Sequence, residues 1–286
     1  MEEREHSGGR PRLIGTMLRL LTAAVLAPAL WAIIKLAPRP TFSAIAVAAI
    51  LVACWECYGV LEKRGSRPFK LLGLAAGLAL TWSFSLLSPS FDVVLPLVLV
   101  GAATVLLSML LRNDPSEMLD TVLVTWFPLL FVALALAHVV RLRWMPGPDG
   151  SDLVLLLFLC VIFSDTFALY VGRAVGRHKL APRLSPAKTW EGGVAGLIGS
   201  VTGALIAHVW FYQRLPISHA LVLGVVLGLA GALGDLSVSM VKRAANVKDA
   251  SSLLPGHGGL LDRMDSLLFA APLLYYYYRV FLQGAS

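Results

Sequence analysis

Long apolar runs recur along the whole chain, and short polar segments separate them. A helix of about 20 apolar residues is long enough to cross the hydrocarbon core of a bilayer. The pattern therefore predicts an all-α, polytopic helical membrane protein with about nine transmembrane helices. These lie over residues 16–36, 41–61, 69–88, 91–111, 119–140, 153–175, 190–212, 217–240 and 264–283. The first run is too long for a signal peptide and lacks a small-residue cleavage site, so we expect a membrane anchor.

Composition supports the same class of protein. The chain is 57% hydrophobic and only 14% charged, whereas a soluble domain carries about a quarter charged residues. A water-soluble fold of this size could not bury so much apolar surface. The three cysteines do not form a disulfide framework. Cys54 and Cys57 lie inside an apolar run, where helix packing or lipid contact is expected rather than redox chemistry.

The basic residues are distributed unevenly around the predicted spans. If the N-terminus lies inside, most of the 24 Lys and Arg residues fall in the inner segments, which favours an N-in, C-out topology. A net charge of +7 could indicate a nucleic-acid partner. Here the basic residues adjoin apolar runs, so we interpret them as topology determinants and phosphate ligands, and expect no nucleic-acid partner.

The spans fall into two regions after a cytosolic tail, residues 1–15. Residues 16–140 form an N-terminal membrane region of five helices that is rich in Leu and Ala. Residues 141–286 form a C-terminal catalytic membrane region of four helices with long cytosolic loops. Glycines recur about every fourth residue in its middle helices, which suits either close internal packing or a dimer seam.

Four aspartates in or beside the last spans need an explanation: Asp165, Asp235, Asp262 and Asp265. A carboxylate at the centre of a membrane helix costs at least ~2.5 kcal/mol on insertion scales. Asp262 and Asp265 are three residues apart and would share a helix face. With Asp235 they could offer three hard oxygen ligands to Mg²⁺. The alternative is that these aspartates only pair with nearby basic side chains.

Two polar loops could bind anions. The first contains Lys179, Ser185, Lys188 and Thr189. Ser185 followed by proline predicts a helix start whose free N–H groups would face a phosphate. The second contains Lys242, Arg243, Lys248, Asp249 and Arg263, with a glycine-rich stretch around His257. Each lysine alone is equally compatible with a solvated inner loop. Carboxylates interleaved with cations over 242–265 favour phosphoryl or nucleotidyl transfer, in which positioning and charge neutralisation do most of the catalysis.

These motifs resemble those of the phosphatidate cytidylyltransferase (CDP-diacylglycerol synthase) family. Residues 239–265 resemble its signature S-x-x-K-R-x4-K-D…P-G-H-G-G-x-x-D-R-x-D nearly throughout. The run from Ser164-Asp165 to Glu191-Gly192 resembles a second block of that family. The chain departs from the family at Val238, where Glu is common, and at Ala250-Ser251. The pair Trp55-Glu56 resembles a Trp–Glu pair of the family.

The resemblance implies that CTP and phosphatidate react to form CDP-diacylglycerol and pyrophosphate. The metal ligands would be Asp235, Asp262 and Asp265. They would bind Mg²⁺, and the site could also hold a second cation. The catalytic group would add Lys248, Asp249 and His257. The substrate-binding group would contain Lys179, Ser185, Lys188, Thr189, Lys242, Arg243, Arg263 and Asp165. Expected partners are CTP, phosphatidate, membrane lipids and, by family analogy, a second copy in a homodimer. The resemblance also implies a multi-pass protein of a bacterial-type plasma membrane, with its active site facing the cytosol.

Two other functions stay open. A CTP-dependent lipid-alcohol kinase would use similar groups but release CDP instead of pyrophosphate. A transporter also carries charges within the membrane, although it should place them near the midplane and show internal repeats. The sequence shows no such repeat, and its charges gather toward one side of the predicted membrane region.

Overall fold

The computed structural model describes residues 28–86, 94–147, 149–251, 253 and 258–283. The chain divides into two compact units, Met1–Pro38 and Arg39–Ser286. In the first unit, residues 28–36 are helical. The predicted tail and most of the first predicted span lie outside the described residues.

The N-terminal part of the second unit contains four helical segments. They are α2 (Arg39–Lys63), α3 (Lys70–Ser83), α4 (Val94–Leu111) and a long rod formed by α5 (Pro115–Pro128), η1 (Leu129–Leu134) and α6 (Ala135–Arg143). Asp114 caps α5, because its carboxylate accepts a 2.7 Å hydrogen bond from the Ser116 N–H. The Ser116 hydroxyl donates to the same carboxylate oxygen. These two hydrogen bonds, first that of the hydroxyl and then that of the N–H, hold the pKa of the Asp114 carboxyl below its usual value. The π-helical turn η1 begins directly after Pro128, which has no N–H to donate.

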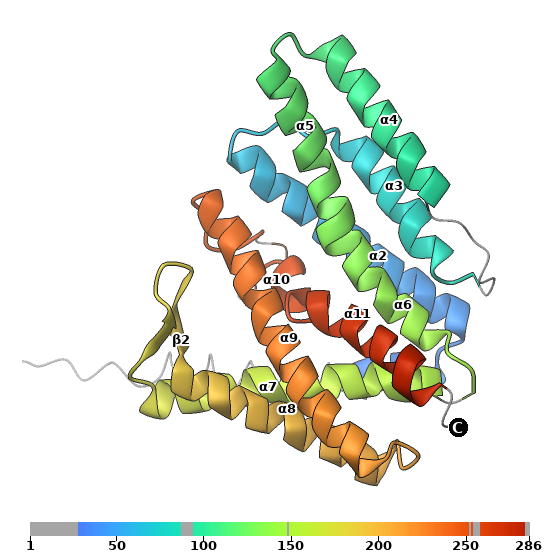
Figure 1. Ribbon diagram of the computed structural model, residues 1–286, viewed down its shortest axis with the longest axis vertical. Coiled ribbons are helices and arrows are strands. Elements are labelled where there is room, and N and C mark those ends of the chain that lie inside the picture. The colour runs from blue at the N-terminus through green and yellow to red at the C-terminus, as the bar shows by residue number, and fades with distance from the viewer. Residues whose placement is uncertain (1–27, 87–93, 148, 252, 254–257, 284–286) are drawn as a thin grey trace, which may run out of the picture. The chain divides into compact units, whose positions relative to one another are not determined.

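The C-terminal part is built on three long helices, α7 (Asp149–Val175), α8 (Trp190–Trp210) and α9 (Ile217–Ala244). Short α10 (Leu261–Met264), α11 (Leu267–Tyr277) and η2 (Tyr278–Leu282) follow. Figure 1 shows α8 running along α7, with α9 crossing them and α11 lying beside α9. The glycine spacing serves internal packing: a Cβ added at Gly203 would meet the Leu159 carbonyl oxygen of α7 at 3.0 Å.

A β-hairpin interrupts the helical fold between α7 and α8. Strand β1 (Lys179–Ala181) pairs antiparallel with β2 (Ser185–Thr189), and Lys179 lies opposite Thr189. The helix start predicted at Ser185 is therefore wrong. The helix begins at Trp190, because pairing with β1 keeps residues 185–189 extended and Thr189 acts as the N-cap. The Thr189 Oγ1 accepts a 3.2 Å hydrogen bond from the Gly192 N–H.

Five helical stretches in the described residues are long and apolar enough to cross a membrane. They are Arg39–Lys63, Pro115–Arg143, Asp149–Val175, Trp190–Trp210 and Ile217–Ala244. Two further apolar helices, Lys70–Ser83 and Leu97–Leu111, are shorter. The prediction of a helical membrane protein is confirmed, whereas the count of nine spans and the N-in, C-out orientation stay predictions.

Candidate active site

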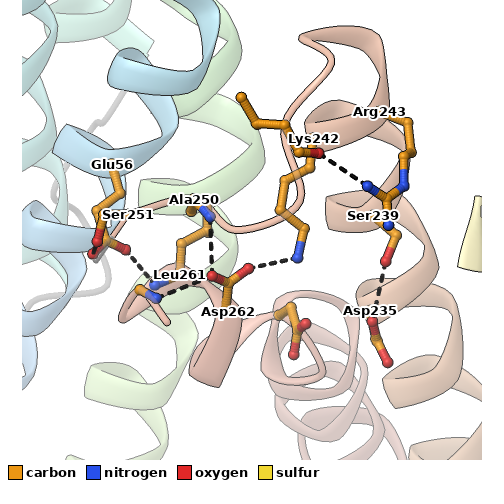
Figure 2. A network of polar contacts seen from close by, with 12 residues as sticks. Glu56, Asp235, Ser239, Lys242, Arg243, Ala250, Ser251, Leu261 and Asp262 are labelled. Carbon is orange, nitrogen blue, oxygen red and sulfur yellow. Dashed lines mark hydrogen bonds and ion pairs between the residues drawn. The ribbon is translucent and has the colours of Figure 1, made fainter. Parts of the chain in front are cut away.

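Two lysine–carboxylate pairs mark the polar centre of the C-terminal part. The Lys242 Nζ of α9 lies 2.5 Å from the Asp262 Oδ1 of α10, and both side chains are nearly buried. The Lys188 Nζ of β2 lies 2.6 Å from the Asp235 Oδ2 of α9. Figure 2 shows Lys242 and Asp235 projecting from the same helix, with Asp262 facing Lys242. Helix α9 therefore carries one member of each pair.

Asp262 also organises the loop that precedes it. Its Oδ2 accepts hydrogen bonds of 3.0 Å from the N–H groups of Ala250 and Gly259. Next to it Gly258 adopts a φ of +78°, a conformation that favours glycine. The Asp262 carboxylate thus has three donors in this structure: one lysine and two backbone amides.

A third polar contact joins α7 to the segment before α11. The Asp265 Oδ1 accepts a 2.7 Å hydrogen bond from the Ser266 N–H. The Ser266 hydroxyl lies 3.4 Å from both the Asp265 Oδ1 and the Asp165 Oδ2. Asp235 interacts electrostatically with Asp165 and with Asp265. Three carboxylates from three segments therefore share one region and lie close enough to repel one another, an arrangement that attracts a cation.

A cavity of about 340 Å³ opens beside these carboxylates. Its polar lining includes Asp165, Arg173, Lys188, Thr189 and Asp235. Glycines of α7 and α8 complete one wall and let the two backbones approach each other. A cavity of this size with a few convergent charged groups is typical of a small-molecule site.

The other predicted site residues are more scattered. Arg243 points at backbone, with its Nε 3.2 Å from the Leu184 carbonyl oxygen and its Nη1 3.2 Å from that of Val247. It therefore links the end of α9 to the hairpin. Arg263 interacts electrostatically with Asp165.

Four predicted site residues do not take part in the ion pairs and carboxylate contacts described above. The side chains of Lys179, Lys248 and Asp249 are exposed, and Ser185 pairs with Ala181 in the hairpin. His257 lies outside the described residues.

The described residues contain no group of three or more His, Cys, Asp or Glu side chains arranged to hold a metal ion. The predicted three-aspartate set is therefore not preassembled in this part of the chain. Asp262 already has three donors, while Asp235 and Asp265 lie in the shared carboxylate region. Mg²⁺ usually binds through one or two carboxylates together with substrate phosphates. The donor chemistry fits that mode of binding.

The prediction from sequence missed three residues of this site. Ser266 bridges two carboxylates, Arg173 lines the cavity, and the Ser239 hydroxyl lies 3.4 Å from the Asp235 Oδ1. Ser239 stands one helical turn after Asp235, a spacing that could have indicated the contact. Ser266 follows Asp265 directly, but its contact with α7 depends on tertiary packing.

Comparison with known proteins points to one family. The model of the family described as "Cytidylyltransferase family" matches residues 17–281. "Uncharacterized protein YnbB" of Escherichia coli (strain K12) is 38% identical over 184 residues, which are 63% of this chain and 61% of that protein.

Two relatives carry the name "Phosphatidate cytidylyltransferase". That of Haemophilus influenzae is 43% identical over 150 residues, 50% of this chain and 52% of that protein. That of Bacillus subtilis (strain 168) is 31% identical over 243 residues, 81% of this chain and 88% of that protein. The chain thus spans 61% and 52% of the Escherichia and Haemophilus proteins, but most of the Bacillus protein. Since the family model also matches most of the sequence, the chain belongs to the cytidylyltransferase family.

Proposed function

We propose that this protein transfers the cytidylyl group of CTP to phosphatidate and releases pyrophosphate. The observation that carries the proposal is the pair of buried or half-buried contacts Lys188–Asp235 and Lys242–Asp262 beside the carboxylate region and cavity. Lysines held in place by carboxylates are ready cationic ligands for phosphate oxygens. The names of the Haemophilus and Bacillus relatives support the choice of substrates.

The reaction needs little proton transfer. A phosphate oxygen of phosphatidate attacks the α-phosphorus of CTP, and the bond from that phosphorus to the bridging oxygen of the β-phosphate breaks. Pyrophosphate leaves with the bonding electron pair. The nucleophile is already anionic near neutral pH, so the site needs no strong general base. Lys188 and Lys242 would neutralise the charge that gathers on the phosphate oxygens.

A magnesium ion fits this proposal as a resident cofactor. Asp235 and Asp265 would hold it together with phosphate oxygens of CTP. When bound, the cation supplies charge neutralisation and orientation for the phosphates. Asp262 would complete the predicted ligand set if Lys242 moved from it to a substrate phosphate; in the present structure Asp262 binds Lys242 and the N–H groups of Ala250 and Gly259.

The proposal includes a membrane topology. We infer about nine spans with the N-terminus inside, so that the hairpin and the 242–265 segment face the cytosol of a bacterial-type cell. The bias of basic residues supports this orientation. CTP would enter from the cytosol, while the lipid would arrive laterally with its headgroup at the inner interface. A homodimer rests on family analogy alone.

The discriminating experiment follows two labelled atoms. Purified protein in detergent receives Mg²⁺, phosphatidate and CTP labelled at either the α- or the γ-phosphate. Label from the α-position should appear in the lipid, and label from the γ-position should appear in pyrophosphate. Transfer of the γ-label to a lipid alcohol would instead identify a kinase. The absence of any nucleotide turnover would favour transport.

A matched pair of variants tests the role of the site. Lys188→Gln should lower the rate of α-label transfer by about tenfold to a hundredfold, because one positioned cation is lost. Arg214→Gln is the control, because Arg214 lies between α8 and α9 in a loose 3.9 Å contact with Asp149, outside the site. Equal rates in both variants would remove Lys188 from the proposed machinery.

A further inference from the structure

Glu56 is a buried carboxylate that the proposed reaction does not use directly. It belongs to α2, in the N-terminal membrane region, and is only 4% exposed. A buried carboxylate is costly unless hydrogen bonds or a counter-charge compensate it. Figure 2 shows that Glu56 faces the loop that leads into Asp262, although the two segments are far apart in the sequence.

Three donors of that loop contact Glu56. The Ser251 hydroxyl donates to the Oε1 at 2.5 Å, and the Leu260 N–H donates to the same oxygen at 3.0 Å. The Leu261 N–H donates to the Oε2 at 2.7 Å. One side chain of α2 thus holds a residue at the start of the loop and two residues at its end.

Asp262 also accepts hydrogen bonds from both ends of this loop. It accepts hydrogen bonds from Ala250, next to Ser251, and from Gly259, next to Leu260. Glu56 and Asp262 therefore each link residues 250–251 to residues 259–260. Close packing supports this arrangement, because a Cβ added at Gly259 would lie 2.7 Å from the Glu56 Oε2. A larger residue there would require either the Glu56 carboxylate or the backbone at residue 259 to shift.

We propose that Glu56 is a positioning residue, which fixes the loop so that Asp262 meets Lys242. The Leu261 N–H that donates to Glu56 belongs to the first residue of α10, directly before Asp262, so this contact fixes the start of the short helix that carries Asp262. The N-terminal membrane region would then contribute to the active site and not only anchor the chain. The consequence for catalysis rests on the proposed function, whereas the structural consequence does not.

Two measurements test the proposal on the full chain in detergent. Glu56→Ala should increase hydrogen–deuterium exchange in the peptide covering residues 250–262, because the loop loses all three contacts. It should also lower kcat for cytidylyl transfer by about tenfold or more, since a displacement of about 1 Å at a reacting group can cost a hundredfold. Glu56→Gln keeps the shape and one carbonyl acceptor, so its exchange and rate should lie between those of the wild type and of Glu56→Ala.

Ser251→Ala provides a variant with an intact α2 and an intact Glu56. It should increase exchange less than Glu56→Ala does. Combining it with Glu56→Ala should add no further loss of rate, because the Ser251–Glu56 contact is already absent. If the rate losses of the two single variants add fully in the double variant, Ser251 and Glu56 do not act through their mutual contact.

Glu62→Gln is the matched control. Glu62 lies on the same helix, but its side chain is 44% exposed and pairs with Lys70 away from the loop. This variant should keep both the exchange pattern and kcat. The proposal is overturned if folded Glu56→Ala retains wild-type exchange over 250–262, or if its kcat stays within about twofold of a wild type that is active. If the wild type does not turn over CTP and phosphatidate, the proposed function fails, and exchange alone still decides the role of Glu56.

Discussion

The buried pair Lys242–Asp262 gives the sharpest quantitative prediction about this protein. Both side chains are nearly buried, at 12% and 11% exposure, and the nitrogen–oxygen distance is 2.5 Å. Lys242→Met removes the cation and leaves a buried carboxylate with only its two backbone donors. Removing one partner of a buried pair costs about 3–5 kcal/mol. We expect the lower end, about 3 kcal/mol, because those backbone donors remain.

The expected loss can be measured as thermal unfolding in detergent, followed by tryptophan fluorescence. For a chain of about this size, 1 kcal/mol corresponds to roughly 2–4 °C, so the Tm should fall by about 6–12 °C. Asp262→Asn should cause a similar fall, because it removes the carboxylate in direct contact with the nearly buried Lys242. The double variant leaves no unpaired charge and should be more stable than the sum of the single effects predicts, by at least ~2 kcal/mol.

The exposed pair Lys70–Glu62 supplies the control for this cycle. Glu62 is 44% exposed, and solvent screens the interaction, so Glu62→Gln should change stability by no more than about 1 kcal/mol. If the effects of Lys242→Met and Asp262→Asn add within about 0.5 kcal/mol, the two groups are independent and the reasoning is refuted.

Three more predictions concern the rest of the site. Thr189→Val removes the N-cap of α8 and should cost about 1 kcal/mol, seen as a Tm lower by roughly 2–4 °C; an unchanged Tm would exclude the capping role. Gly234→Ala would place a Cβ against the Asp265 carbonyl oxygen and should lower activity by about tenfold or more. Gly59→Ala should leave activity unchanged, because Gly59 does not line the cavity and an added Cβ there would meet no neighbouring segment within 4 Å; equal losses in the two variants would contradict the packing argument. Excess EDTA should abolish cytidylyl transfer and added Mg²⁺ should restore it, whereas persistent activity would rule out the proposed cofactor.

The contact between Glu56 and the loop also bears on how the N-terminal and C-terminal helices depend on each other. The Glu56–Leu261 hydrogen bond joins residues 205 positions apart in the chain. A truncated protein that begins after α2 would lose this contact, and with it the closure of the loop before Asp262. The N-terminal helices would then be needed for a correctly formed site even though they supply none of the groups proposed to touch substrate.

Hydropathy by itself predicted the helical membrane protein, because lipid satisfies no backbone polar group and forces long apolar runs into helices. The polar residues of the C-terminal half could also be chosen from sequence, because charges are rare in apolar runs and each one there needs a compensating partner. Asp165 and Asp235 were selected in this way, whereas Lys188 was selected as a cation of a polar loop, and the structure places all three around one cavity.

Tertiary structure decided which of these groups meet. Local rules predicted a helix from Ser185, but pairing between residues 179–181 and 185–189 keeps that segment extended. The pairing of Lys188 with Asp235, the bridge from Ser266 to Asp165, and the closure of the loop by Glu56 depend on how helices cross. Periodicity describes one helix at a time, whereas an ion pair between helices depends on their separation and rotation. Those are set by the packing of glycine faces and buried side chains, which no single segment of sequence contains.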